Sequence, residues 1–336
     1  MDNRPIRPAG PGWKRALITG GAGFLGTHLC RSLLAGGTHV ICVDNFLTSS
    51  ATALEDLRGN AGFALYEADV AAEPLTGIGL PGDIDLVVHL ASPASPMDYH
   101  RHPLATLEVG SSGTRNALEL AARTGARFVL TSTSEVYGDP AVNPQNESYY
   151  GNVNPVGPRS VYDEAKRFAE ALTAAHQRAG TVDAGIVRIF NTYGPGMRPD
   201  DGRIVPTFAC QALRGEPLTV TGDGRQTRSL CHVDDTVRGI LAVAASGRPG
   251  PVNIGNPDEA TVLEIAERII KLAGSSSGIE HIPFPEDDPM TRCPDIARAR
   301  QELGWEPAIG WPEGLSSTLA WFAAELGLAP RVEVRV

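Results

Sequence analysis

The feature that most constrains this sequence is a short apolar run that leads into regularly spaced glycines. Residues Arg15–Thr19 have the composition of a strand, and glycines at three-residue spacing follow from Gly20 to Gly26, where a helical pattern begins. Such glycines allow a tight turn and a close approach of the backbone to a pyrophosphate, which the N–H groups of the helix N-terminus can bind. The pattern predicts a dinucleotide-binding turn.

A second apolar run, residues 39–43, is followed by Asp44. An acidic residue at this position is placed to accept hydrogen bonds from an adenosine ribose and would repel a 2′-phosphate, so it favours NAD over NADP. The alternative for the whole motif is a glycine-rich surface turn, which would leave the position of Asp44 to chance.

Strand-like runs alternate with helical patterns through the first part of the chain. The runs lie at 15–19, 39–43, 63–66, 85–90, 127–131 and 184–189. This alternation predicts βαβ units and a parallel sheet. We therefore expect an α/β fold: a Rossmann-type doubly wound parallel sheet with a smaller C-terminal α/β substrate-binding lobe.

The texture of the sequence changes after Asn191 to glycine- and proline-rich turns between shorter elements. We expect a disordered tail over 1–12, an NAD-binding domain over 13–190, and a smaller lobe over 191–328, parts of which return to the first domain. Helices are expected at 104–124, 162–179, 262–273 and 312–326. Ser160 and Asp163 have the spacing of a capping box at the second of these helices.

Composition excludes several classes of function. The net charge of -10 and the pI near 5.3 argue against a nucleic-acid or anionic-membrane surface, which would need a basic footprint. An apolar run long enough to span a membrane and an apolar signal core are both missing, so we expect a cytoplasmic protein. The five cysteines are odd in number and lack CxxC spacing, which indicates reduced thiols and no metal site.

A second motif sets Tyr162 and Lys166 four residues apart, just inside a predicted helix. Residues at this spacing share a helix face, and an ammonium beside a phenol favours the phenolate. Lowering the pKa of a tyrosine from about 10 to neutrality requires about 4 kcal/mol, so a second cation has to contribute. Such pairs also occur by chance on solvated helices, but the dinucleotide-binding turn in the same chain favours a catalytic pair.

The two motifs together resemble the extended short-chain dehydrogenase/reductases, a family of nucleotide-sugar enzymes. Within it the chain is most similar to the UDP-glucuronate decarboxylases, or UDP-xylose synthases, from about residue 15 to 325. The similarity lies in the segments His89–Pro96, Thr131–Gly138, Gly151–Pro155, Arg188–Pro195, Gly215–Val220, Gln226–Arg228 and Arg292–Asp295. These segments cover both expected lobes, which makes the resemblance more specific than a single motif.

The resemblance implies that Tyr162 removes a proton from the sugar 4-hydroxyl while NAD⁺ oxidises C4. Lys166 and the nicotinamide charge would lower the pKa of the phenol, and Thr133 would hydrogen-bond the same hydroxyl. The oxidised glucuronate is a β-keto acid, so it loses its carboxylate as CO₂. Protonation of C5 and return of the hydride would give UDP-xylose and regenerate NAD⁺.

The resemblance also assigns residues near the departing carboxylate. Glu135 and Arg292 would order the carboxylate, a water or the enolate, with Arg292 as the expected proton source. Ser134 stands where related 4,6-dehydratases usually have an acidic Asp, and a hydroxyl is too weak an acid for that role. A decarboxylase is therefore favoured over a 4,6-dehydratase or a 4-epimerase. A catalytically silent NAD-binding protein is the alternative from another class.

The remaining expected site residues fall into two groups. The cofactor would meet Gly20, Gly23, Phe24, Leu25, Gly26, Asp44, Asn45, Asp69, Val70, Leu90, Ser92, Tyr162, Lys166 and Thr192. The UDP-sugar substrate would meet Tyr99, Asn191, Arg203 and Arg228. For Arg228 the alternative is an ion pair with Asp223 or Asp234, and for Tyr99 it is simple packing. The family also implies a homodimer formed through the helices at 104–124 and 162–179.

The sequence departs from the decarboxylase pattern at two places. Glu108-Val109-Gly110-Ser111 replaces the usual Lys-Thr-Asn-Thr. Glu108 reverses the charge of the lysine, and Gly110 removes the amide of the asparagine. We expect the glycine to loosen its helix. Cys231-His232-Val233 replaces a run with an aromatic residue that we expect near the uridine. The changes at Glu108 and Gly110 lead to the hypothesis that the 4-keto pentose is held less tightly and escapes before the hydride returns. The products would then be UDP-4-keto-xylose and NADH beside UDP-xylose.

Overall fold

The central element is a seven-stranded sheet in which every pairing is parallel. The computed structural model describes residues 12–328. The strand order is β11-β6-β5-β4-β1-β2-β3. The strands are β1 (Arg15–Thr19), β2 (His39–Asp44), β3 (Phe63–Glu67), β4 (Leu86–His89), β5 (Arg127–Thr133), β6 (Ala184–Ile189) and β11 (Pro251–Ile254). The six strands expected from the sequence are confirmed, and β11 adds a seventh.

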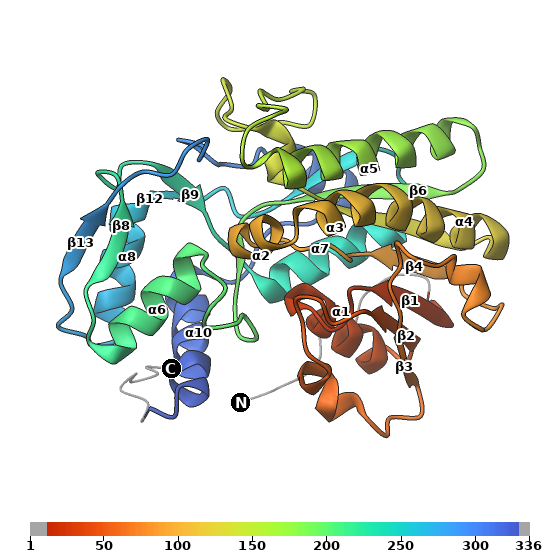
Figure 1. The fold of residues 1–336 in the computed structure, drawn as a ribbon, viewed down its shortest axis with the longest axis horizontal. Helices are drawn as coiled ribbons and strands as arrows, with labels where there is room; N and C mark the ends of the chain where they lie inside the picture. The colour runs from red at the N-terminus through yellow and green to blue at the C-terminus, as the bar shows by residue number, and fades with distance from the viewer. Residues whose placement is uncertain (1–11, 329–336) are drawn as a thin grey trace.

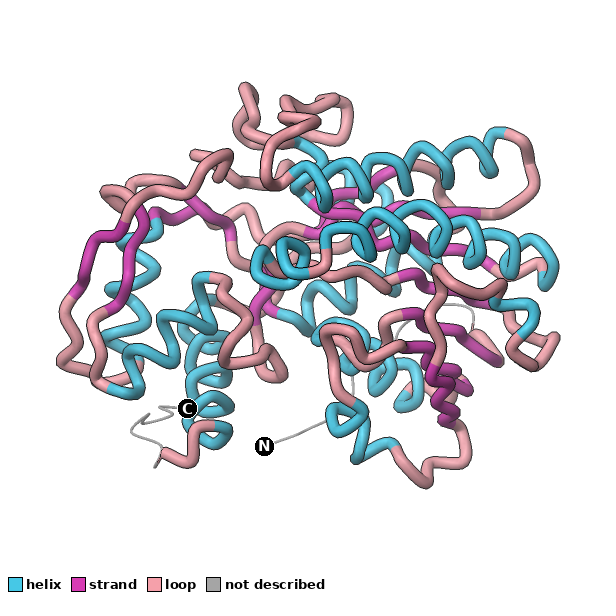
Figure 2. The backbone as a smooth tube through the Cα atoms, in the orientation of Figure 1, coloured by secondary structure: helices cyan, strands magenta, loops and turns pink. Residues whose placement is uncertain are grey.

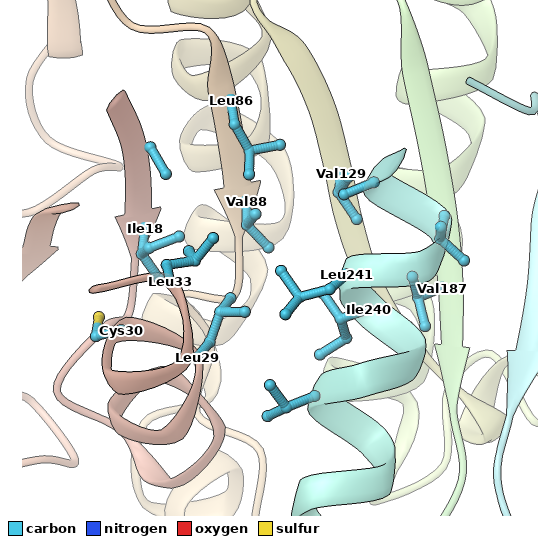
Figure 3. Close-up of a cluster of buried hydrophobic side chains, with 14 of the residues drawn as sticks. Ile18, Leu29, Cys30, Leu33, Leu86, Val88, Val129, Val187, Ile240 and Leu241 are labelled. Carbon is cyan, nitrogen blue, oxygen red and sulfur yellow. The ribbon is translucent and has the colours of Figure 1, made fainter. Parts of the chain in front are cut away.

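Helices cover both faces of this sheet (Figure 1). Along β4, Leu86 and Val88 point into one core and Val87 into the other, as the two-residue period of a strand requires. The first core is closed by α1 (Phe24–Ala35) and α7 (Val233–Ser246). Figure 3 shows Leu29 and Leu33 of α1 with Ile240 and Leu241 of α7 against the strands. The predicted doubly wound sheet is confirmed.

The opposite face carries the helices nearest the catalytic motif. These are α3 (Pro103–Glu108), α4 (Thr114–Thr124) and α5 (Ser160–Arg178). Residues of α4 and α5, among them Leu118 and Ala169, are buried against Phe128 and Leu130 of β5. Because β5 is buried along its whole length, its carboxyl end is a rigid base for the residues that follow it.

A smaller lobe with its own core lies beside the carboxyl edge of the sheet (Figures 1 and 2). It contains α6 (Ile204–Arg214), β8 (Leu218–Thr221), β9 (Thr227–Ser229), β12 (Glu259–Thr261), α8 (Val262–Leu272), β13 (Ile279–Ile282) and α10 (Trp311–Glu325). Between these elements the chain returns to the sheet, where it forms α7, β11 and α9 (Ala297–Leu303). The fold therefore consists of two lobes, and segments from the second half of the chain return to the first lobe.

Two further expectations concern the first residues of the chain and helices that could span a membrane. The disordered tail expected over 1–12 lies outside the described residues, except for Gly12. Among the helices of residues 12–328, none combines the length and the apolar character needed to cross a membrane.

The helix that carries the Tyr–Lys motif begins differently from the sequence prediction. Arg159 is the N-cap residue of α5 and no side chain caps the helix, so the capping box expected from Ser160 and Asp163 is wrong. Asp163 lies in the first turn of α5 and is buried. A capping box does form at α8, between Thr261 and Glu264.

The helix predicted over 104–124 is interrupted by a π-helical turn at Val109–Gly113. A Cβ atom built on Gly110 would lie 2.6 Å from the Cβ of Ala165 and 2.8 Å from its carbonyl oxygen. Glycine therefore lets this turn approach α5 directly beside Lys166. The expectation that Gly110 merely loosens its helix is replaced by a packing role.

Substitution of Gly110 by Ala should destabilise the protein by about 1–3 kcal/mol, because the added methyl group overpacks the contact with α5. Chemical denaturation of the two proteins measures the difference. Gly77→Ala is the matched control, since a Cβ at that position meets no neighbour. Equal stability of Gly110→Ala and the parent protein would contradict the packing role.

Candidate active site

A cavity of about 1270 Å³ opens at the carboxyl edge of the sheet, between the sheet and the smaller lobe. Pockets for one drug-sized ligand usually measure about 300–1,000 Å³, so this cavity has room for two large ligands. Its wall includes every residue that the sequence assigned to the cofactor and the substrate, and all of the expected catalytic residues except Arg292.

One end of the cavity is built by the glycine turn. Gly20 has a φ of 69°, and a Cβ there would lie 2.7 Å from the Cα of Ala91, so only glycine fits. A Cβ on Gly26 would lie 2.3 Å from the carbonyl oxygen of Gly20, because the first turn of α1 packs tightly on the loop. The backbone thus presents a helix N-terminus to the cavity, as a pyrophosphate requires.

Asp44 lies at the end of β2 on the same wall. Its carboxylate accepts hydrogen bonds from the backbone N–H groups of Ala22 (2.9 Å) and Phe46 (2.9 Å), and from Ser49 (2.8 Å). These bonds tie the glycine turn to β2 and fix the Asp44 carboxylate on the wall, where the sequence predicted the contact with the ribose. The residues present therefore fit NAD.

The segment that follows β3 carries the two residues predicted to contact adenine, and it lies on the cavity wall. Asn45 donates a hydrogen bond to the Asp69 carboxylate at 3.1 Å. The buried Asn116 of α4 donates to the carbonyl oxygen of Val70 at 2.8 Å, which holds this segment against the helix. Asp69 and Val70 thus line the wall in a fixed position, as expected for adenine contacts.

Tyr162 and Lys166 lie buried on the cavity side of α5. The Lys166 ammonium donates to the carbonyl oxygen of Thr131 at 2.9 Å and lies 5.8 Å from the centre of the Tyr162 ring. Burial raises the pKa of Tyr162 to about 12, against the opposing effects of Thr133 and Arg203. Burial lowers the pKa of Lys166 to about 8. The side chains alone therefore do not make the phenol a base at neutral pH.

Tyr99 belongs to the same group. Its ring stacks on the Tyr162 ring, with centroids 5.3 Å apart and planes 8° from parallel. Its hydroxyl is buried and has no hydrogen-bond partner within residues 12–328. The packing considered for Tyr99 is therefore present, and its contact with the substrate stays a prediction.

Glu135 lies between two arginines just beyond the end of β5. Its Oε2 atom accepts hydrogen bonds from Arg159 at 2.7 Å and from Arg292 at 3.0 Å. Burial alone would raise the pKa of Glu135, but Arg292 and Arg159 outweigh it and hold the pKa below its ordinary value. Glu135 is thus an anion that orders two cations.

Arg292 takes a different place from the one expected. It is only 1% exposed, and it donates to the carbonyl oxygen of Ser134 at 2.7 Å as well as to Glu135. It does not belong to the cavity wall. Arg159 does, and the sequence reasoning missed it. The available signal was its position three residues before Tyr162, which puts both on one helix face.

The arginines expected to hold the nucleotide are paired with carboxylates. Arg228 donates to Asp288 at 2.7 Å, and not to Asp223 or Asp234 as the alternative had it. Asp288 also accepts from Arg159 at 3.2 Å, so it bridges the two lobes.

The other two expected nucleotide ligands lie on the wall as well. Arg203 donates to Asp201 at 2.7 Å. Asn191 has a buried side-chain oxygen without a partner in the described part of the chain, and is therefore free to receive a ligand donor.

The two departures from the family pattern are not equivalent in space. Glu108 is exposed and lines the cavity, whereas Gly110 faces α5. Cys231 and His232 form the buried strand β10, which pairs with β7 (Thr192–Tyr193), and they do not line the cavity. The expectation that residues 231–233 border the uridine is wrong, because they sit in a layer behind the wall.

Asp163 is a buried carboxyl group whose Oδ1 atom has no hydrogen-bond partner among residues 12–328. Burial, with a contribution from the Glu135 carboxylate, raises its pKa to about 8. In the unfolded chain the same group ionises near pH 4. The folded state therefore keeps a proton that the unfolded state loses, and this contribution to stability falls as the pH rises from about 4 to about 8.

Asp163→Asn removes this titration. The melting temperature of the parent protein should therefore fall relative to that of Asp163→Asn between about pH 4 and pH 8, and the difference should level off above the folded-state pKa. Thermal unfolding of both proteins across this range measures the effect. The exposed Asp258→Asn is the control and should follow the parent. A constant difference at every pH would contradict the assignment.

Comparison with known proteins agrees with this geometry. Residues 16–255 match the model of the NAD dependent epimerase/dehydratase family. UDP-glucuronic acid decarboxylase 1 of Danio rerio is 49% identical over 93% of this chain and 73% of its own length.

Two solved structures are similar over the whole described fold. A dTDP-glucose 4,6-dehydratase from Streptomyces venezuelae, solved with NAD, has a TM-score of 0.84 and 29% identity, covering 93% of this chain and 98% of its own. A UDP-glucuronic acid 4-epimerase from Bacillus cereus, in complex with UDP-glucuronic acid and NAD, has a TM-score of 0.82 and 27% identity, covering 93% and 99%. The chain belongs to the NAD dependent epimerase/dehydratase family of extended short-chain dehydrogenase/reductases.

Proposed function

We propose that this protein is an NAD-dependent UDP-glucuronate decarboxylase that forms UDP-xylose through a UDP-4-keto intermediate. The observation that carries the proposal is one cavity in which the Tyr162–Lys166 pair and a group of arginines around Glu135 lie together. The first group suits oxidation of a sugar hydroxyl, and the second suits a carboxylate. The 49% identity to a UDP-glucuronic acid decarboxylase supports the same activity.

In the oxidation step, Tyr162 takes the proton of the sugar 4-hydroxyl and Thr133 orients that hydroxyl. NAD, when bound, would accept the hydride from C4, would later return it, and would contribute the positive charge of its nicotinamide ring. The Tyr162 phenol needs this second cation, which the bound cofactor would supply, because burial raises the pKa of Tyr162 to about 12. Lys166 stays fixed on the Thr131 carbonyl, from which it stabilises the phenolate.

The decarboxylation step asks little of the protein. A ketone at C4 lies β to the C6 carboxylate, so the C5–C6 bond breaks to release CO₂ and the electron pair is delocalised as an enolate. A proton from water then adds to C5 in place of the lost carboxylate. Glu135 is held as an anion by two arginines, which suits ordering of a water or the enolate more than proton donation.

The two other reactions of related enzymes fit this site less well. A 4,6-dehydratase needs an acid where Ser134 stands, and the Ser134 hydroxyl is buried and weakly acidic. A 4-epimerase has no use for loss of the carboxylate, although the Bacillus cereus 4-epimerase acts on UDP-glucuronic acid. Product analysis separates the three.

Incubation of the NAD-loaded protein with UDP-glucuronate should release CO₂ and form UDP-xylose. Tyr162→Phe should lower the rate by about 10²- to 10⁴-fold, since it removes the proton acceptor. Tyr150→Phe, at a tyrosine that is 90% exposed, should leave the rate unchanged. Formation of UDP-galacturonate without CO₂ would show an epimerase and refute the decarboxylase.

The same incubation measures product release. Because Glu108 places a negative charge on the wall where related decarboxylases have a lysine, part of the substrate should leave as UDP-4-keto-xylose, with NADH accumulating at 340 nm. UDP-xylose as the sole product, with no rise in NADH, would remove this second product from the proposal.

We also infer that the protein is a homodimer in the cytoplasm. The helices α3 and α5 pack against each other and carry exposed apolar side chains, Leu104 (72%), Leu107 and Phe168 (51%). A second copy would bury this face. The five cysteines are free thiols, as the reducing cytoplasm maintains.

Phe168→Glu should convert the dimer to a monomer, because it places a charge in the buried face. Light scattering of the parent protein and the variant gives the two masses. Val142→Glu is the control, since Val142 is exposed on the loop that precedes α5 and not on either helix. A monomeric parent protein would refute the dimer.

A further inference from the structure

We propose that Arg159 selects substrates whose sugar carries a carboxylate. The inference rests on the proposed function and adds to it the residue that distinguishes a uronate from the corresponding neutral hexose. It concerns a group of five side chains, called here the arginine cluster: Arg159, Arg228, Arg292, Glu135 and Asp288.

Position is the first argument. Arg159 is the N-cap of α5, one turn before Tyr162, and it is the only arginine of the cluster bonded to both Glu135 and Asp288. Its guanidinium also lies near the Tyr99 hydroxyl, where it counteracts the rise that burial causes in the pKa of Tyr99. Tyr99 stacks on Tyr162. Arg159 thus borders the place where the sugar must lie for oxidation.

Availability is the second argument. Arg292 is 1% exposed, is held by Ser134 and Glu135, and lies behind the cavity wall. Arg228 is 5% exposed, with one end on the Thr227 carbonyl. Both partners of Arg159 are carboxylates on the wall itself, so a substrate carboxylate can replace Asp288 without breaking a backbone contact. Arg159 is therefore the member that can exchange an internal anion for a bound one.

Charge is the third argument. The cluster sets three guanidinium groups against two carboxylates, so it holds one positive charge in excess. Burial and the Glu135 carboxylate raise the pKa of Asp163, so a further negative charge beside the cluster is disfavoured. A single uronate carboxylate neutralises the cluster, whereas a neutral hexose leaves a partly buried charge without a counterion. The cluster thus matches the charge of one carboxylate.

Binding of UDP-glucuronate and UDP-glucose to the NAD-loaded protein tests the proposal. In Arg159→Gln the affinity for UDP-glucuronate should fall about tenfold or more, the range expected for a charge-assisted hydrogen bond, and the affinity for UDP-glucose should change less than about twofold. Calorimetry gives both constants. Arg203→Gln is the matched control, because an arginine on the diphosphate should weaken both ligands alike. Equal weakening of both ligands by Arg159→Gln would overturn the proposal.

Asp288→Asn tests the same idea in the opposite direction. It adds a second excess positive charge to the cluster, so the preference for UDP-glucuronate over UDP-glucose should increase; a decrease would overturn the proposal. This variant also decides the matter if Arg159→Gln fails to fold. CO₂ release by the parent protein is measured separately. Absence of CO₂ release would refute the proposed function, whereas a binding preference for the uronate that depends on Arg159 would still stand.

Discussion

A parallel sheet has to be covered on both faces, and most features of this molecule depend on that constraint. Each crossover helix returns the chain to the amino end of the sheet, so all strands run in the same direction and end at the same carboxyl edge. The glycine turn after β1, Asp44 at the end of β2, and Thr133 at the end of β5 are brought to one cavity by this geometry alone. The smaller lobe closes that edge and adds arginines.

The second organising feature is the pairing of buried cations. Each arginine at the substrate end has a carboxylate partner, because an unpaired charge in this environment costs several kcal/mol. In the binding mode proposed above, a phosphate or carboxylate of the substrate replaces one of these internal carboxylates. The affinity for a nucleotide sugar would then report the difference between the two anions.

Much of this arrangement could be predicted from the sequence. The strands, the doubly wound fold and the cofactor wall follow from local patterns, since apolar period, glycine spacing and strand ends are encoded within short segments. The burial of Asp163 and the retreat of Arg292 behind Glu135 could not, because they depend on the competition between burial and charge and on contacts between segments more than a hundred residues apart. The same holds for residues 231–233, whose sequence reads like a site segment but packs as an inner layer.

The contact between Gly110 and Ala165 joins two positions that are 55 residues apart in sequence and touch in space. A side chain at either position takes volume from the other. The two positions therefore cannot change independently during evolution: a relative with a larger residue at one of them must have a smaller residue at the other or a wider separation of the two helices. An asparagine amide at position 110 and the methyl group of Ala165, beside Lys166, are therefore alternative ways to fill the same space.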